Sequence, residues 1–294
     1  TVEMGMRRSP WSAAFGWTRL ALFAFAQEHD ERPDNPGVLL YNRKRPPSRT
    51  TTWPMREQAQ SGQDVGTIAA NVRSVFERMR QAAARAGRQS DEIVLVAAAK
   101  SATVEQVREA IGAGIAIIGE NRLQEAQPKI AALEWMARWH FIGRLQRRKV
   151  KSVVGVFEMI HSVDTLELAE EINTRALQAG VTQAVLLEVN VGGETSKAGF
   201  DPEDLASRLP ELQRFHALNI RGLMTVPPPS LVSEDARPYF RRLREFAQTW
   251  SQSGVPGLRL TELSMGMSHD FEVAIEEGAT MIRVGTALFG ARRG

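Results

Sequence analysis

The chain has 294 residues, enough for one large or two ordinary domains, and 43% of them are hydrophobic, which allows a sizeable core. It contains no cysteine, which excludes disulfides, thiolate metal sites and cysteine nucleophiles. The net charge of +3 comes from residues 1–54, which carry eight Lys/Arg and five Asp/Glu. The remainder is balanced in charge and therefore lacks the basic surface that nucleic acid would require. No apolar run reaches the roughly eighteen residues of a membrane span.

Residues 1–62 differ in composition from the rest of the chain. They contain the segments PDNPG and RKRPPSRTTTWP and follow no sustained helical or strand period. We predict a poorly structured N-terminal extension here, with the native domain beginning near Met55. The alternative is a targeting segment, because Arg7 and Arg8 precede an apolar stretch with an A-x-A-like end, although Arg19 interrupts that stretch.

From Asp64 onwards, helical and strand-like segments alternate. Apolar side chains at helical spacing over residues 64–87, stopped by Gly87, predict an opening helix. Helical stretches such as Thr165–Ala179 and Glu234–Gln252 separate eight short apolar runs with little polar alternation, as expected of parallel strands buried on both faces. The expected strands are Ile93–Ala99, Ile115–Gly119, Trp139–Gly143, Met159–Val163, Ala184–Asn190, Ile220–Val226, Leu258–Leu263 and Met281–Val284.

This alternation predicts an α/β fold, a single (β/α)8 barrel of the TIM type over residues 63–294. The alternative is an open doubly wound sheet, which would place a Gly-x-Gly-x-x-Gly turn after the first strand. The first strand instead runs into AAAKSAT, so that dinucleotide-binding fingerprint is missing.

In a barrel of this type, functional side chains gather at the carboxyl ends of the strands. Lys100 is the most informative, because a lysine that ends the apolar run IVLVAAAK loses solvation of its ammonium form and becomes available as a nucleophile for a carbonyl. A lysine that simply reaches the solvated rim is the alternative. The other strand-end positions, which we expect to converge on one mouth, are Glu120, Asn121, Gly143, His161, Asp164, Glu188, Asn190, Met224, Ser264 and the turn Arg283–Thr286.

The loops after the seventh and eighth expected strands are rich in hydroxyls and glycine. Barrels often bind phosphate with these two loops. Ser264 and Thr286 offer hydroxyls, while Gly266 and Gly285 allow close approach of the backbone. Together with Lys100, such a phosphate site suggests a phosphorylated carbonyl compound held as a Schiff base. The alternative is two ordinary turns without a ligand.

Other polar residues have simpler interpretations. His140 and His161 lie in strand-like segments and are expected to be hydrogen-bonded core residues. None of the five histidines has metal-ligand spacing, so no metal site is expected. Lys197, in a polar loop, is expected to be a mobile or structural cation, and the basic cluster at 147–151 a solvated face.

Several segments of the sequence match a known family. They are LVAAAK, IIGENRLQEA, WHFIGRLQRRK, HSVDTLELAEEIN, LLEVNVGGETSKAGF, RGLMTV and LSMGMSHDFEVAIEEGATMIRVGTALFG, the last being the most specific. Through them, residues from about 64 to 292 resemble the pyridoxal phosphate homeostasis proteins of the YggS/PROSC type, whose fold is similar to the barrel domain of alanine racemase. The resemblance implies pyridoxal 5′-phosphate (PLP) as the cofactor.

The resemblance also implies roles for individual residues. Lys100 would form the internal aldimine with PLP, and Arg283 would face the pyridine nitrogen, as in the related racemases. The other matching positions would hold the phosphate (Ser264, Gly285 and Thr286) or line the cofactor (Asn121 and Met224). This chain departs from the family pattern before the lysine, where Ala98 and Ala99 replace a frequent Val-Ser, and at Arg122, where a tyrosine is frequent.

Both a carrier and an enzyme are consistent with such a site. An arginine at the ring nitrogen keeps that nitrogen unprotonated, which makes the ring a weaker electron sink than an aspartate partner would. Racemisation needs a second acid/base group, which related racemases take from a tyrosine on another domain. Tyr41 and Tyr239 are not at strand ends, and the sequence ends at Gly294, soon after the expected barrel.

We therefore expect a non-catalytic, cytoplasmic carrier and buffer of PLP that maintains vitamin B6 and amino-acid/keto-acid balance. It would be a monomer whose partners are PLP and PLP-dependent apoenzymes, with no nucleic acid, membrane or metal. Two alternatives stay open. One is a PLP-dependent amino-acid racemase or another fold-type III enzyme, and the other is a Schiff-base aldolase that works without the cofactor.

Overall fold

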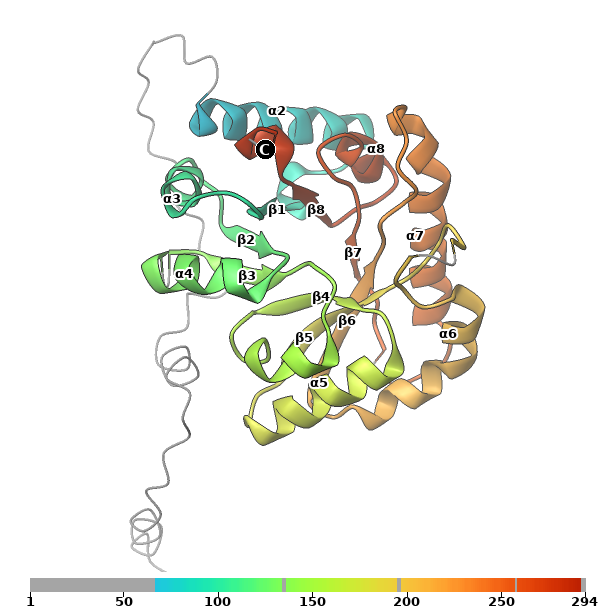
Figure 1. Ribbon diagram of the computed structural model, residues 1–294. Coiled ribbons are helices and arrows are strands. Elements are labelled where there is room, and N and C mark those ends of the chain that lie inside the picture. The colour runs from blue at the N-terminus through green and yellow to red at the C-terminus, as the bar shows by residue number, and fades with distance from the viewer. Residues whose placement is uncertain (1–66, 134–135, 195–196, 257, 292–294) are drawn as a thin grey trace, which may run out of the picture. The chain divides into compact units, whose positions relative to one another are not determined.

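The computed structural model describes residues 67–133, 136–194, 197–256 and 258–291, so the expected extension over 1–62 lies outside the described residues. Within them, eight parallel strands pair in the order of the sequence, and the eighth pairs with the first to close a barrel. Figure 1 shows the helices arranged around the strands. The predicted (β/α)8 barrel is confirmed.

The strands are short, and helices or 3-10 turns connect them. The strands are β1 (Val94–Ala98), β2 (Ile117–Glu120), β3 (Arg138–Phe141), β4 (Met159–Val163), β5 (Gln183–Glu188), β6 (Leu218–Met224), β7 (Glu262–Ser264) and β8 (Met281–Val284). The α-helices are α2 (Ile68–Arg85), α3 (Val104–Gly112), α4 (Leu123–Leu133), α5 (Leu166–Gln178), α6 (Pro202–Arg208), α7 (Arg237–Ser251), α8 (Phe271–Glu276) and α9 (Thr286–Phe289). The 3-10 helices are η1 (Ser90–Glu92), η3 (Arg147–Ser152), η4 (Leu209–Arg214) and η5 (Ser233–Ala236). None of the described helices is both long and apolar enough for a membrane crossing.

One strand differs clearly from the expectation. The apolar run Leu258–Leu263 predicts a strand, yet β7 begins only at Glu262. Leu258 and Leu260 are buried, but their amides donate to the Val255 carbonyl and to Ser251 Oγ of α7. Apolar burial therefore occurs here without strand pairing, and periodicity alone does not separate the two cases.

Alternate residues of each strand point into the barrel, and this lining changes along the strands. Near the amino ends it is apolar, with Met159 of β4 and Met281 of β8 in one buried cluster. Two residues further along the same strands come His161 and Arg283, both buried. The interior thus turns from apolar to polar towards the carboxyl ends of the strands.

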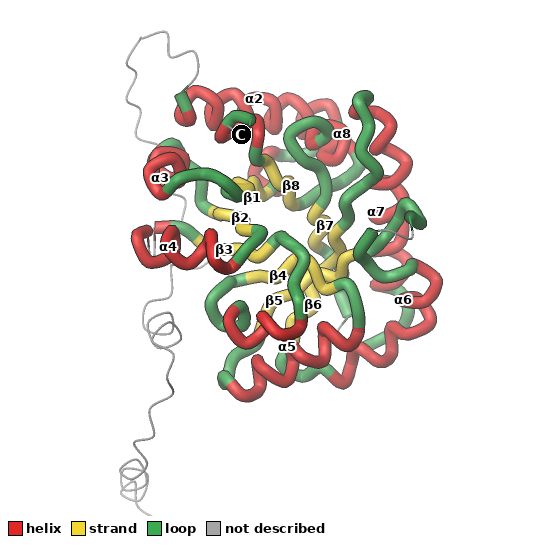
Figure 2. Tube along the Cα trace, viewed as in Figure 1, coloured by secondary structure: helices red, strands yellow, loops and turns green. Residues whose placement is uncertain are grey.

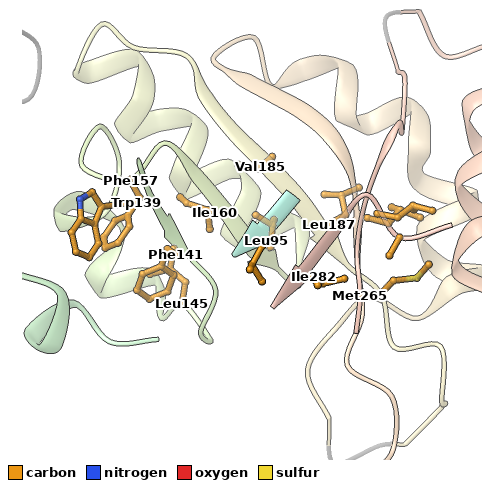
Figure 3. Close-up of a cluster of buried hydrophobic side chains, with 14 of the residues drawn as sticks. Leu95, Trp139, Phe141, Leu145, Phe157, Ile160, Val185, Leu187, Met265 and Ile282 are labelled. Carbon is orange, nitrogen blue, oxygen red and sulfur yellow. The ribbon is translucent and has the colours of Figure 1, made fainter. Parts of the chain in front are cut away.

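The opposite faces of the strands pack against the helices. Trp139 and Phe141 of β3 are buried there, and Phe141 meets Phe157 edge-on with ring centroids 5.3 Å apart. Figure 3 shows this aromatic group on the left, with Leu187 and Ile282 to the right of the centre. Burying apolar surface contributes roughly 25 cal/mol per Å², so this layer is a main source of stability.

Helix α2 ties together the two ends of the barrel sequence. Asn71 Nδ2 donates to the Leu288 carbonyl of α9 at 2.9 Å, and Arg78 Nε donates to Glu272 Oε1 of α8 at 2.6 Å. Figures 1 and 2 show α2 beside α8. Because α2 precedes β1 while α8 and α9 flank β8, these bonds reinforce the seam between β1 and β8.

Candidate cofactor-binding site

Lys100 lies in a tight turn at the end of β1. The Ala102 amide closes the turn by donating to the Ala99 carbonyl at 3.0 Å, and Ser101 has a φ of 72°, in the left-handed region. Lys100 itself is exposed, so it reaches the rim as in the alternative interpretation and does not lose its solvation as expected from the apolar run. Since a non-glycine residue rarely adopts this φ, the surrounding structure must hold the turn in place.

The turn after β8 lies directly beside β1. The two strands pair in parallel, and a Cβ added to Gly285 would stand 3.1 Å from the Ala98 carbonyl oxygen. A larger residue at 285 would therefore press against β1, which leads into the Lys100 turn. The register brings Lys100, Gly285 and the exposed Thr286 to neighbouring strand ends.

Ser268 joins this turn, although sequence reasoning did not single it out. Its Oγ accepts hydrogen bonds from the Gly285 and Ala287 amides, each at 3.2 Å. These two amides therefore orient the Ser268 hydroxyl, whose own proton can be donated to an oxygen of an anion beside the turn. The sequence does place Ser268 in the loop after the seventh strand, where it could have been considered. Ser264 is nearer the strand end, and the strand-end rule therefore selects Ser264.

The loop after β7 is folded back by Gly266. This glycine has a φ of +88°, and an added Cβ would stand 2.5 Å from the Ala274 Cβ of α8. Asp270 Oδ1 accepts from the Met267 amide at 2.6 Å. The close contact with α8 and this hydrogen bond direct Ser268 towards the turn after β8.

Ser264 occupies a different environment from the one expected of a phosphate ligand. It is fully buried, its Oγ accepts from Arg283 Nη1 at 2.7 Å, and it lies 2.9 Å from His161 Nδ1. These partners make its hydroxyl a support for Arg283 inside the barrel. Ser268, by contrast, lies at the turn after β8.

A chain of hydrogen bonds crosses the barrel interior. A guanidinium can only donate, so Arg283 donates to Ser264 Oγ and the Ser264 hydroxyl donates to His161 Nδ1. His161 Nε2 then donates to His140 Nδ1 at 2.9 Å. Burial lowers the pKa of His140 to about 3 and lowers the pKa of His161 as well. Both rings are therefore neutral at pH 7, and the prediction of hydrogen-bonded core histidines is confirmed.

Arg283 is fixed at the polar end of the interior. Besides its bond to Ser264, it donates from Nη2 to the Thr225 carbonyl at 2.9 Å. Burial lowers its pKa to about 10, and the carboxyls of Glu188 and Asp270 oppose that shift. The guanidinium consequently stays cationic at neutral pH and presents a positioned donor.

Two carboxyls at the ends of β4 and β5 complete the charged cluster. Burial raises the pKa of Glu188 to about 7, the charge of Asp164 adds to the rise, and Arg283 and Arg144 oppose it. Burial also raises the pKa of Asp164, whose Oδ2 lies 3.7 Å from Arg144 Nε. Glu188 is therefore a carboxyl that titrates near neutrality and is influenced by the charge of Arg283.

Asn121 and Met224 occupy contrasting environments. Asn121 is half-buried and lines a cavity of about 310 Å³ together with Gly143 and Arg144. A Cβ at Gly143 would stand 2.3 Å from the Asn121 carbonyl oxygen, so glycine is required there. Met224 is buried within the apolar cluster of the interior. Asn121 is accessible to a ligand at the mouth, whereas Met224 is covered.

Two further groups of cations lie where a structural role is expected. Lys197 forms an ion pair with Glu194 in the described part of its loop, which supports the structural interpretation of this lysine. In the basic cluster, Arg147, Arg148 and Lys151 are exposed on η3, as expected of a solvated face.

The arrangement has the parts that a phosphorylated aldehyde with a polar ring requires. Lys100 supplies an amine at the rim, the Gly285 and Ala287 amides form an oxygen-binding turn on the neighbouring strand, and Arg283 supplies a fixed cation. An amine can condense with an aldehyde, and a serine hydroxyl oriented by two amides can donate to a phosphate oxygen. PLP has an aldehyde, a phosphate and a pyridine ring, so the residues present fit it.

Comparison with known proteins shows the family to which the chain belongs. The family described as "Alanine racemase, N-terminal domain" matches residues 64–293. The pyridoxal phosphate homeostasis protein of Aquifex aeolicus is 47% identical over 220 residues, which cover 74% of this chain and 96% of that protein. Its counterpart in Pseudomonas aeruginosa is 42% identical over 229 residues, which cover 78% of this chain and 97% of that protein. The structure of PipY of Synechococcus elongatus PCC7942 with PLP bound is 39% identical, with a TM-score of 0.68, and the match covers 76% of this chain and 100% of that one. The chain therefore belongs to the pyridoxal phosphate homeostasis protein family.

Proposed function

We propose that this chain binds PLP covalently through Lys100 and acts as a carrier and buffer of the cofactor, not as an enzyme. The observation that carries the proposal is the pairing of β1 with β8, which sets Lys100 beside the turn at Gly285. PipY, a relative with the same fold, has been solved with PLP bound. Membership in a homeostasis family supports the carrier role.

Each part of the site would hold one part of the cofactor. The Lys100 amine would form the covalent link, and the phosphate would be held by the hydroxyl of Ser268, which the Gly285 and Ala287 amides orient, and by the hydroxyl of Thr286. When bound, PLP supplies an electrophilic aldehyde and a ring that can take up electron density. Arg283, held by Ser264 and Thr225, would face the ring nitrogen. Asn121 would line the cofactor, whereas Met224, which is covered, would support this lining without contacting the ligand.

The proposed arginine at the ring nitrogen weakens the site as a catalyst. A guanidinium keeps its proton, so the ring nitrogen would stay unprotonated and the ring would withdraw electrons less strongly. A racemase also needs an acid/base group on the second face of its substrate. Among the described residues the one tyrosine is Tyr239, which lies on α7 and packs against the outer core.

One observation favours the second candidate, a PLP-dependent racemase or another fold-type III enzyme. Glu188 stands near Arg283 with a pKa of about 7, which is where a general acid or base works best at neutral pH. An amino acid bound beside Lys100 would then meet a carboxyl able to give or take a proton. The two candidates predict different results in an activity assay.

The test is to load the purified protein with PLP and supply a panel of amino acids. A carrier gives no racemisation, decarboxylation or transamination above that of free PLP, yet transfers PLP to an apoenzyme. Turnover of any amino acid that is lost in Glu188→Gln would establish the enzyme instead. As part of the proposal, the carrier would be a cytoplasmic monomer that supplies PLP-dependent apoenzymes; light scattering tests the monomer.

A further inference from the structure

A buried ion pair stands behind the proposed PLP lysine. Lys129 of α4 and Glu120 at the end of β2 lie 2.8 Å apart, Nζ to Oε1. Their exposed fractions are 5% and 0%. Lysine and glutamate are rarely buried to this extent, so the pair needs a reason beyond packing.

The lysine of this pair also reaches the turn that carries Lys100. Lys129 Nζ donates to the Ala99 carbonyl at 2.7 Å, and the same carbonyl accepts from the Ala102 amide at 3.0 Å. Ala99 directly precedes Lys100 in the chain. One ammonium group therefore connects the end of β2 to the backbone of the turn in which Ser101 adopts its left-handed φ.

The pair is costly as a purely structural element. Glu120 Oε2 is buried and has no hydrogen-bond partner among the described residues. Burial raises the pKa of Glu120, and the bond and charge of Lys129 oppose that rise. Because well-packed apolar residues can replace buried ion pairs without loss of stability, stability alone does not require this one.

We propose that Lys129, anchored by Glu120, is a positioning residue that holds the Lys100 turn so that the Lys100 amine is aimed at a carbonyl bound at the mouth. This inference rests on the proposed function. The ion pair also fixes Glu120, which directly precedes Asn121, so the ends of β1 and β2 are held in register by one contact. Lys129 acts on the covalent step through the backbone and touches no ligand.

The test separates covalent capture from docking by comparing two ligands. PLP has the aldehyde that Lys100 attacks, whereas pyridoxine 5′-phosphate has the same ring and phosphate but no aldehyde. In the double variant Lys129→Met/Glu120→Gln, we expect affinity for pyridoxine 5′-phosphate to stay within about twofold of wild type. The rate or extent of the Lys100–PLP adduct, read from its visible absorbance and circular dichroism, should fall about tenfold or more.

A matched control is available at the other end of the barrel. Arg138 and Glu158 form a partly buried ion pair at 3.4 Å near the amino ends of β3 and β4. Arg138→Met/Glu158→Gln should leave the affinity for pyridoxine 5′-phosphate and the formation of the PLP adduct unchanged. If Lys129→Met/Glu120→Gln does not fold, Lys129→Gln/Glu120→Gln serves instead, with the same expected loss of adduct, since the two amides keep a polar contact.

The outcomes are distinct. If folded Lys129→Met/Glu120→Gln loses affinity for both ligands equally, or forms a normal PLP adduct, the positioning role is overturned and the proposed function is unaffected. Failure of the wild-type protein to form any adduct overturns the proposed function and this inference with it. Selective loss of the PLP adduct, with pyridoxine 5′-phosphate still bound, supports the inference.

Discussion

Arg283 donates from Nη1 to the Ser264 hydroxyl oxygen at 2.7 Å, and both side chains are buried. This bond assigns Ser264 to the support of the arginine. Because the same hydroxyl is bonded to His161, the position of Arg283 depends on a chain of neutral polar groups that spans the barrel interior. A cation held in this way is ready to meet a ring nitrogen without rearrangement.

Replacing Ser264 by alanine should destabilise the fold. The substitution removes the acceptor for a buried guanidinium N–H and the donor to His161, and unsatisfied buried groups cost about 1–3 kcal/mol. Urea unfolding of Ser264→Ala without PLP should show this loss. A variant as stable as wild type would mean that the Arg283–Ser264 bond contributes little.

Replacing Ser268 by alanine should have the opposite profile. Ser268 is half-buried in a loop, so stability should hardly change, while PLP affinity should fall by about tenfold or more as a hydrogen bond to a charged group is lost. Titration with PLP, together with displacement by inorganic phosphate, measures the effect. Unchanged affinity for both ligands would place the phosphate elsewhere.

Gly285→Ala tests the closeness of the two strands at the site. The added Cβ would stand 3.1 Å from the Ala98 carbonyl oxygen, so the turn must move away from β1, which leads into the Lys100 turn. We expect weaker PLP binding with little change in far-UV circular dichroism. Gly112→Ala is the matched control, because a Cβ there meets nothing within 4 Å; equal effects of the two substitutions would contradict the prediction.

Glu188 should make stability depend on pH. Its pKa is about 7 in the folded protein against an ordinary value of 4.5, because of burial and the charge of Asp164. Between these pH values the folded chain binds more protons than the unfolded chain, so this group lowers the free energy of unfolding as pH rises, and the full penalty is present above pH 7.

Glu188→Gln removes that penalty. The stability of the variant relative to wild type should therefore rise by up to about 3 kcal/mol between about pH 4.5 and pH 8. Urea unfolding of both proteins across this range, without PLP, isolates the effect of Glu188 from those of the buried histidines, which both proteins share. A difference that does not change with pH would contradict the assignment.

The fold was predictable because its signal is local. Short apolar runs separated by helical stretches reveal strands buried on both faces, and the strand-end rule then brought out Lys100 and Gly285. The start of β7 was not predictable in this way, since Leu258 and Leu260 are as buried as strand residues but bond to α7 and its flanking turn.

The finer details of the site depend on the directions in which loop side chains point, which cannot be predicted from the sequence. Whether Ser264 or Ser268 faces the turn after β8 is decided by the bend at Gly266. The contacts of Lys129 could not be predicted either, because a lysine in a helix is usually solvated. Only the packing of α4 against β2 brings its amine to the Ala99 carbonyl and to Glu120.

The central claim is that Lys100 captures PLP at this barrel mouth. Its most direct test is to incubate the purified protein with PLP, record the visible spectrum, reduce with borohydride and map the labelled lysine by mass spectrometry. We expect a visible band, absent in Lys100→Ala, and a label on Lys100 among the six lysines of the chain. A protein that takes up no PLP, or a label that persists on another lysine when Lys100 is replaced, would contradict it.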